Sequence, residues 1–464
     1  MWTLLVSRLE QSVGLEVYLT RSQGVGGVIK RDVEDFVVEE VLVDGSKARV
    51  QRSEGGVGGV ALGSSLLKSR YLLCVLVKRN WDTLIALGKV VGQLGLRSGQ
   101  VQIAGIKDAK AVTAQYVTVE DVSVEAVQRL DLKDIELRSF GYLRMALSTY
   151  YLLGNDFRVV VRGIRYSRRV IEDRVRKIMD EVGSVGGVAN FFGHQRFGTV
   201  RPVTHLVGKH LVRGRVKEAA MLFLAEPSRL EHPGSRLARE GLRDSLDFEG
   251  ALVDFPRQLR FERLMLKRLV EVPGDFAGAF MVLPGRLRGL FVEAYQSFLF
   301  NRFLSGRIRR GLVLNVAEVG DFVVSVERSG LPLSGLFKVV SVENLAEVNR
   351  AIGAGRMRVA IPLVGYGQGL SKGVQGDVER EILEEEGVVP GDFRVRCLPE
   401  VSSRGRLRAV VSPVKDFSFR VDEDDGAMGS RRRLMLGFSL FRGSYATVVL
   451  REIMKSPRPV EAGF

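Results

Sequence analysis

The chain is poor in cysteine, histidine and asparagine. Its 464 residues include two cysteines, four histidines and seven asparagines. Cys74 and Cys397 are far apart and have no Cys or His neighbours at ligand spacing, which argues against a disulfide framework and a zinc site. His205 and His210 are five residues apart and do not share a helix face, so we expect no metal. This cysteine usage predicts a reducing, cytoplasmic location.

Long apolar runs are also missing. No window reaches eighteen uninterrupted apolar residues, and the first thirty residues lack the basic start and continuous apolar stretch of a signal peptide. We therefore expect a soluble protein with no membrane partner. The length predicts two or three domains, each able to bury its own core without metal or disulfide staples.

Positive charge is in excess. Sixty-nine Lys and Arg against 54 Asp and Glu give a net charge of +15 and a pI near 9.9. The excess is spread over several segments, which favours a charged surface on a folded body: 162–177, 307–310, 404–408 and 431–433. On charge alone, nucleic acid is the first candidate for a polyanionic partner and an anionic membrane surface the second, and we expect nucleic acid. An ion-paired surface of a heat-adapted protein is compatible with either.

A short segment between two β-prone runs concentrates ionisable groups. Asp108 is preceded by Lys107 and followed by Lys110, between predicted strands at 101–104 and 113–119. A lone Asp in such a loop is most often a turn former. The two lysines, however, stabilise its ionised form. A positioned carboxylate of this kind can act as a nucleophile, a base or an electrostatic stabiliser.

A second cluster, residues 190–198, combines amides, arginine and aromatic rings. Asn190 is followed closely by Phe191, Phe192 and Phe197. Aromatic rings with amides and arginine stack on and read an extruded base. The alternative is that the phenylalanines are core residues beside a glycine-containing turn.

Periodicity and turn residues predict the elements around these clusters. We expect a strand over 26–42 with Phe36 in its middle, a turn at 154–157, and a helix over 290–304 with one solvated side. The Gly-rich stretch 54–65 contains Gly56-x-Gly58-x-x-Ala61, close to a dinucleotide fingerprint. No buried strand precedes it, so we interpret it as a loop. Residues 210–410 open with charged helical segments and predict a separate domain.

Four motifs, in matching order along the chain, resemble those of the tRNA pseudouridine synthase D (TruD) family: Gly105-x-Lys107-Asp108-x-x-Ala111-x-Thr113-x-Gln115, Asn190-x-Phe192-Gly193-x-Gln195-Arg196-Phe197-Gly198, Tyr295-Gln296-Ser297 with Phe300-Asn301, and Gly443-Ser444-Tyr445-Ala446-Thr447. Lys30 with Glu34-Asp35-Phe36 is similar to that family's opening motif. The resemblance runs from about Gly27 to Lys455.

The resemblance implies an α+β fold: a pseudouridine synthase core with a mixed, largely antiparallel sheet and an inserted α/β TRUD domain. The catalytic domain would then comprise 1–210 and 411–464, with the insertion at 211–410. The resemblance further implies that a uridine in tRNA, most often at position 13, is isomerised to pseudouridine. Asp108 would be the catalytic carboxylate, with substrate-binding residues Lys30, Phe36, Lys107, Asn190 and Phe192.

No cofactor or metal is expected, and a monomer is expected. One alternative from another class stays open. A non-catalytic RNA-binding or RNA-assembly protein would use the same basic surface, although it would not need a pocket carboxylate, which repels phosphate. A methyltransferase that binds a nucleoside cofactor on the Gly-rich loop fails on motif quality.

Overall fold

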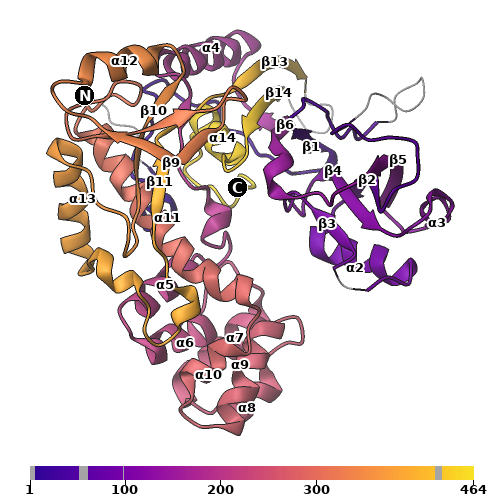
Figure 1. Cartoon of the computed structure of the whole chain (residues 1–464). Coiled ribbons are helices and arrows are strands. Elements are labelled where there is room, and N and C mark those ends of the chain that lie inside the picture. The colour runs from indigo at the N-terminus through magenta and orange to yellow at the C-terminus, as the bar shows by residue number, and fades with distance from the viewer. Residues whose placement is uncertain (1–5, 52–60, 98, 424–430) are drawn as a thin grey trace.

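The computed structural model describes residues 6–51, 61–97, 99–423 and 431–464 (Figure 1). Gly56 and Gly58 of the predicted Gly-rich loop lie outside these ranges. Among the residues described, no helix combines the length and the apolar character that crossing a bilayer requires.

A large sheet of eight strands dominates one side of the molecule (Figure 1). Its strands run in the order β13-β14-β6-β1-β4-β2-β5, and β3 pairs with β4. Among these described strands only β1 and β4 are parallel, so the predicted mixed, largely antiparallel sheet is confirmed. The strands are β1 (Phe36–Leu42), β2 (Tyr71–Arg79), β3 (Val101–Ile103), β4 (Val112–Glu120), β5 (Ile135–Leu143), β6 (Leu152–Ile164), β13 (Lys415–Glu423) and β14 (Arg432–Phe441).

Helices cover the two halves of this sheet separately. α4 (Arg168–Ser184) and α14 (Ala446–Met454) pack with the half formed by β13, β14, β6 and β1, in one hydrophobic core. α2 (Thr83–Gln93) and α3 (Val124–Gln128) cover β2, β4 and β5 with a second core. The Ser167 side chain caps α4, because it accepts a hydrogen bond from the Val170 amide. The short α1 (Arg8–Ser12) precedes the sheet.

Two sequence predictions in this part are wrong. The predicted strand 26–42 begins only at Phe36, since Lys30 has a positive φ of 55° and residues 33–35 form a 3₁₀ turn. The predicted turn 154–157 is the interior of β6. A glycine at position 154 allows β6 and β14 to approach closely, because a Cβ on it would lie 2.1 Å from the carbonyl oxygen of Leu440 on β14.

The middle of the chain begins with helices and continues with a smaller sheet. The helices α6 (Val216–Ala225), α7 (Pro233–Ser245), α8 (Phe248–Asp254), α9 (Arg260–Glu271) and α10 (Phe276–Met281) form the lower body in Figure 1. α5 (Thr204–Val212) precedes them, and the long α11 (Gly285–Arg309) runs beside β11 in the centre of the view. The smaller sheet has the order β11-β10-β8-β9. It and its helices comprise β8 (Phe322–Val326), β9 (Pro332–Val339), α12 (Leu345–Gly353), β10 (Met357–Leu363), α13 (Gly373–Glu386) and β11 (Arg406–Ala409).

The long helix α11 differs from its predicted amphipathic form. Polar residues on the side expected to be solvated are buried, among them Gln296 and Asn301, and both have polar partners in the interior. Arg307, beyond the predicted range, is also buried and pairs with Asp321 at 2.8 Å. Periodicity could not show this, because α11 is covered by elements on several sides rather than one. It is the central helix that joins the middle of the chain to the core.

The chain returns to the large sheet through a small pair of strands. β7 (Val188–Ala189) pairs antiparallel with β12 (Val411–Ser412), directly before β13 and β14 complete the large sheet. Helices and a mixed sheet together make the predicted α+β fold. The boundaries between the catalytic domain and the inserted domain, at 210/211 and 410/411, stay a prediction.

Candidate active site

Asp108 lies in the connection from β3 to β4. Its side chain is 32% exposed, and its Oδ1 is 3.4 Å from the Nζ of Lys30. Lys30 is buried and comes from the loop before β1, which runs parallel to β4. The parallel pairing thus brings the start of β1 beside the end of the Asp108 loop. The Asp108 carboxylate is therefore partly open to solvent and lies beside a buried lysine.

The ring of Phe36 lies under the same lysine. The Lys30 ammonium is 4.5 Å from the Phe36 ring centroid, and the ring packs edge-on against Phe157. Phe36 is 1% exposed. A short turn fixes this position, because Arg162 donates to both oxygens of the buried Asp35 carboxylate at 2.8 and 2.9 Å. The structure therefore brings Lys30, Phe36 and Asp108 together.

Lys107 points elsewhere. It is buried, and its Nζ lies 2.5 Å from an oxygen of the fully buried Glu40. The other oxygen of Glu40 accepts from the Tyr116 amide at 2.9 Å. The expectation that Lys107 stabilises the Asp108 carboxylate therefore differs from the structure, in which Lys30 pairs with that carboxylate. Sequence proximity did not reveal the pairing, since Glu40 is 67 residues away.

A third lysine, missed in the sequence, holds the main chain of the loop. Lys78 at the end of β2 is fully buried, and its ammonium donates to the carbonyls of Asp108 at 2.6 Å and Trp81 at 2.8 Å. Burial lowers the pKa of Lys78 to about 8, against a raising effect of the Asp108 carboxylate. The Thr83 hydroxyl and the Gln115 amide bind the same loop. The carboxylate therefore stands on a fixed backbone.

Asn190 and Phe192 gather around an arginine from the smaller sheet. Arg408 donates from its guanidinium to Asn190 Oδ1 at 2.7 Å and to the Asn190 carbonyl at 3.2 Å. Its guanidinium carbon is 4.1 Å from the Phe192 ring centroid. The Asn190 amide in turn donates to the carbonyl of Ala409. Arg408 was missed because it lies 218 residues from Asn190, a separation at which spacing carries no signal.

The backbone of Phe192 is held by α11. Asn301 accepts from the Phe192 amide at 2.8 Å and donates to the Phe192 carbonyl at 3.1 Å and the Val13 carbonyl at 3.0 Å. The ring of Phe192 meets Phe300 and Tyr445 edge-on, at 5.6 and 5.9 Å between centroids. Residues of three of the recognised motifs, Phe192, Phe300 and Tyr445, thus pack against one another.

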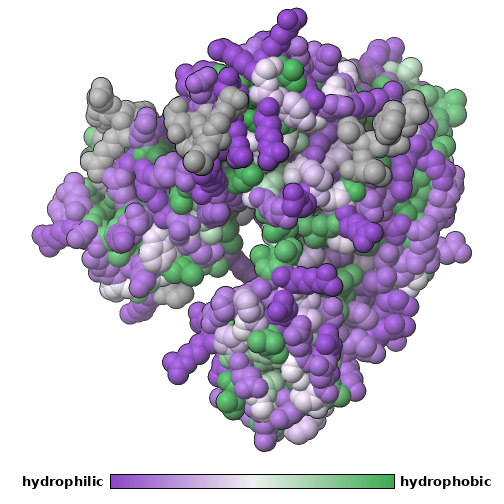
Figure 2. Space-filling model, turned by 180° about the vertical axis from the view of Figure 1, so that it is seen from behind, coloured by the Kyte–Doolittle hydropathy of each residue, from purple (hydrophilic) through white to green (hydrophobic). Residues whose placement is uncertain are grey.

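A cavity of about 340 Å³ lies beside Asn190, and the other five predicted site residues, among them Asp108 and Phe192, do not line it. Asn190 and Arg408 line it, and so does Ala104, four residues before Asp108. The space-filling view shows the molecule deeply hollowed between the part that carries β2–β5 and the helical body (Figure 2). Among the described residues, no group of three or more His, Cys, Asp or Glu side chains is placed to hold a metal ion.

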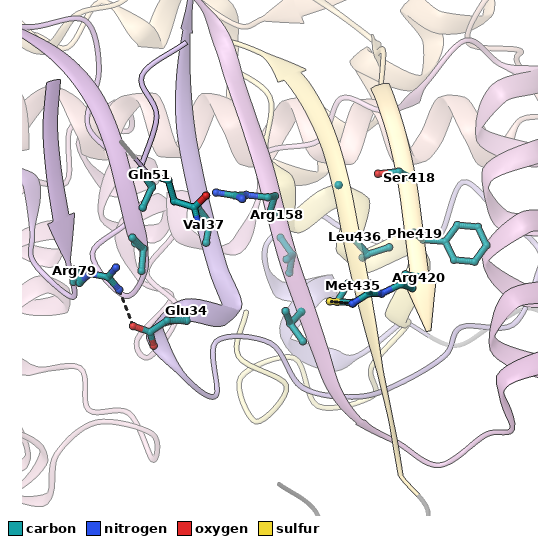
Figure 3. A pocket seen from close by; sticks show the side chains of 15 residues that line it. Glu34, Val37, Gln51, Arg79, Arg158, Ser418, Phe419, Arg420, Met435 and Leu436 are labelled. Carbon is teal, nitrogen blue, oxygen red and sulfur yellow. Dashed lines mark hydrogen bonds and ion pairs between the residues drawn. The ribbon is translucent and has the colours of Figure 1, made fainter. Parts of the chain in front are cut away.

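A larger cavity of about 640 Å³ lies on the open face of the large sheet and contains none of the predicted site residues. Figure 3 shows side chains of β1, β6, β14 and β13 along it, with Arg79 paired to Glu34 at one end. Size alone would have selected this groove. Of the predicted site residues, only Asn190 lines a cavity described above, the one of about 340 Å³.

Residues 12–453 match the model of the family tRNA pseudouridine synthase D (TruD). The chain belongs to this family. It is similar to TruD relatives described as "Probable tRNA pseudouridine synthase D": the one from Methanosarcina mazei is 38% identical, with 97% of this chain and 98% of the relative covered. The one from Pyrococcus furiosus is 37% identical, with 97% and 100% covered.

The TruD likeness extends to the three-dimensional structure. The crystal structure of the "Putative tRNA pseudouridine synthase D (TruD)" from Methanosarcina mazei superposes with a TM-score of 0.80 at 38% identity. The superposition covers 98% of this chain and 99% of the Methanosarcina mazei chain. The family predicted from the motifs is confirmed, and with it the α+β fold and the enzyme class, since TruD is a family of tRNA pseudouridine synthases, which are isomerases. The roles of individual residues, and the monomer, stay predictions.

Proposed function

We propose that this chain isomerises a uridine in tRNA, most often at position 13, to pseudouridine, with Asp108 as the catalytic carboxylate. One observation carries the assignment of the site. Within a motif of the family, Asp108 presents a partly exposed carboxylate whose Oδ1 is 3.4 Å from the ammonium of a buried lysine, Lys30. A structural turn former would need neither the exposure nor the cation.

The reaction exchanges one bond of the base for another. The bond from the sugar carbon C1′ to N1 of uracil breaks, a bond from C1′ to C5 forms, C5 loses a proton and N1 gains one. The product is an isomer, so no oxidant, reductant or group donor is consumed. Asp108 would capture the electron-poor sugar carbon or stabilise charge while the base turns. The ring of Phe192 cannot accept the C5 proton, which leaves water, a backbone group or Asp108.

The target base must leave its stack before a carboxylate can reach it. Phe192, with Asn190 and Arg408 around it, offers an aromatic face beside amide and guanidinium donors. Phe36 is buried beneath the Lys30 ammonium. A base could therefore stack on Phe36 only if Lys30 moved when RNA binds. Without such a movement, Lys30 keeps its contact with the Asp108 carboxylate.

Release of tritium from uracil C5 of a tRNA transcript tests the proposal. We expect release by the parent without added cofactor. We expect a loss of at least about 1,000-fold in Asp108→Asn, which keeps the shape but not the charge. Asp131→Asn, at an exposed position, is the matched control and should release label at the parent rate. Release from Asp108→Asn at the parent rate would refute the catalytic role. Binding without release by the parent would favour the RNA-binding alternative.

A further inference from the structure

Four arginines line the cavity of about 340 Å³ beside Asn190: Arg358 from β10, Arg406 and Arg408 from β11, and Arg442 directly after β14. They come from both sheets, so the cavity lies where the smaller sheet meets the end of the large one. Arg358 and Arg442 are partly buried, and Arg406 is exposed. Tertiary structure alone assembles this group, because 84 residues separate Arg358 from Arg442.

None of these four guanidiniums has a carboxylate partner in the described part of the chain, and no Asp or Glu lines the cavity there. Their hydrogen bonds go mainly to carbonyls: Arg358 donates to Gly330 at 3.0 Å, Arg408 to Gly443 at 2.8 Å, and Arg442 to Thr149. Burial, followed by the charges of Arg406 and Arg196, lowers the pKa of Arg408 to about 10. The positive charge of the cavity is therefore not neutralised by the protein.

The larger groove of Figure 3 provides an internal comparison. Each of its arginines pairs with a carboxylate: Arg79 with Glu34 at 2.9 Å, Arg158 with Glu39 at 3.3 Å and Arg420 with Asp422 at 2.9 Å. The four arginines of the smaller cavity differ from these three, because none of them has a carboxylate partner in the described part of the chain. Unpaired guanidiniums gathered in a concave site are suited to bind the oxygens of a phosphate.

We propose that this cavity is a phosphate subsite, which holds a backbone phosphodiester of the RNA close to the target uridine. This subsite rests on the proposed function and adds the place at which the protein binds the RNA backbone. Arg408 links the two places, because it contacts both Asn190 and Phe192 while it lines the cavity. A phosphate is the fitting ligand because it supplies the missing negative charge, and a volume of 340 Å³ accommodates a nucleotide-sized group.

The double variant Arg406→Gln/Arg442→Gln tests the subsite with an unmodified tRNA transcript. Each arginine that contacts a phosphate adds about one to the slope of log K against log salt. We expect the slope to fall by about 1–2 and the KM for tRNA to rise about tenfold or more, with kcat within about twofold of the parent. Arg406→Lys/Arg442→Lys retains the charges and should retain most of the slope.

Arg158→Gln/Arg420→Gln is the matched control, since it removes two arginines from the groove where carboxylates neutralise them. We expect this variant to keep the parent slope. Ethylation of single phosphates in the transcript then locates the contact. Interference at one or two phosphates near the uridine that is modified should disappear in Arg406→Gln/Arg442→Gln and persist in the control.

A slope, KM and interference pattern equal to those of the control would overturn the subsite, as would lost interference far from the modified uridine. Failure of the proposed function looks different. In that case the parent releases no tritium and forms no pseudouridine, while slope and interference still report on whether the arginines hold phosphate.

Discussion

The Lys78 ammonium donates a 2.6 Å hydrogen bond to the main-chain carbonyl of Asp108, the residue whose carboxylate pairs with Lys30. Lys78 is fully buried and also holds the Trp81 carbonyl. One cation thus fixes the backbone of the predicted catalytic residue, and another lies at its side chain. Lys78 therefore positions the backbone of Asp108, and Lys30 pairs with the Asp108 carboxylate.

Lys78→Met should lower the rate of tritium release more than it weakens RNA binding. Without the ammonium, the Asp108 carbonyl loses its buried donor and the loop shifts, and a displacement of about 1 Å can cost about 100-fold in rate. We expect kcat to fall about 10- to 100-fold with KM for tRNA within about threefold of the parent. Lys89→Met, at an exposed position of α2, should leave both unchanged. Equal kcat in the two variants would contradict the role of Lys78.

Lys107→Met should destabilise the fold, because it leaves the Glu40 carboxylate buried without its cation. Removing one partner of a buried ion pair costs about 3–5 kcal/mol, measured as the free energy of unfolding in denaturant. In Lys107→Met/Glu40→Gln no lone charge remains, and we expect about half of the loss to be recovered. This double variant also tests the predicted substrate-binding role of Lys107. A raised KM for tRNA at recovered stability would support that role, and a parental KM would oppose it.

Asn301→Ala should destabilise the protein by about 2–4 kcal/mol, because the Phe192 amide and two carbonyls lose their partners in the interior. Denaturant unfolding measures the change. Asn315→Ala removes a single exposed hydrogen bond to Ser184 and should cost less than about 1 kcal/mol. Similar losses in the two variants would mean that the α11 amide does not anchor the aromatic cluster.

His205 should make the fold sensitive to mild acid. Its ring is buried and stacks on Phe298, and burial lowers its pKa from 6.5 to about 4. Below pH 6.5 the unfolded chain binds a proton that the folded chain does not. The stability that the neutral ring provides is therefore complete above pH 6.5 and is lost as the pH falls towards 4. Between pH 7 and pH 5 this one group accounts for about 2 kcal/mol.

Denaturant unfolding of His205→Phe at the two pH values measures this contribution. Phenylalanine keeps an aromatic ring in place and cannot bind the proton, so the loss of stability from pH 7 to pH 5 should shrink by about 2 kcal/mol. His232→Phe, at an exposed helix N-terminus, should retain the parental pH dependence. An unchanged dependence in His205→Phe would show that His205 is not the group that titrates.

The family could be recognised from the sequence because its motifs are short local patterns, and the α+β class and the mixed sheet were implied by that resemblance. The run from Gly105 to Gln115 is recognisable from its spacing. Gly154 misled the prediction, since glycine marks a turn and a close strand contact alike and only the neighbouring strand distinguishes them.

Tertiary structure alone decided which charges meet. Lys107 is adjacent to Asp108 in sequence but pairs with Glu40, while Lys30, 78 residues from Asp108, approaches its carboxylate. Arg408, on the edge strand β11 of the smaller sheet, binds Asn190, which lies 218 residues earlier in the chain. An ion pair depends on where the fold places two charged groups and on their burial, and neither can be inferred from distance along the chain.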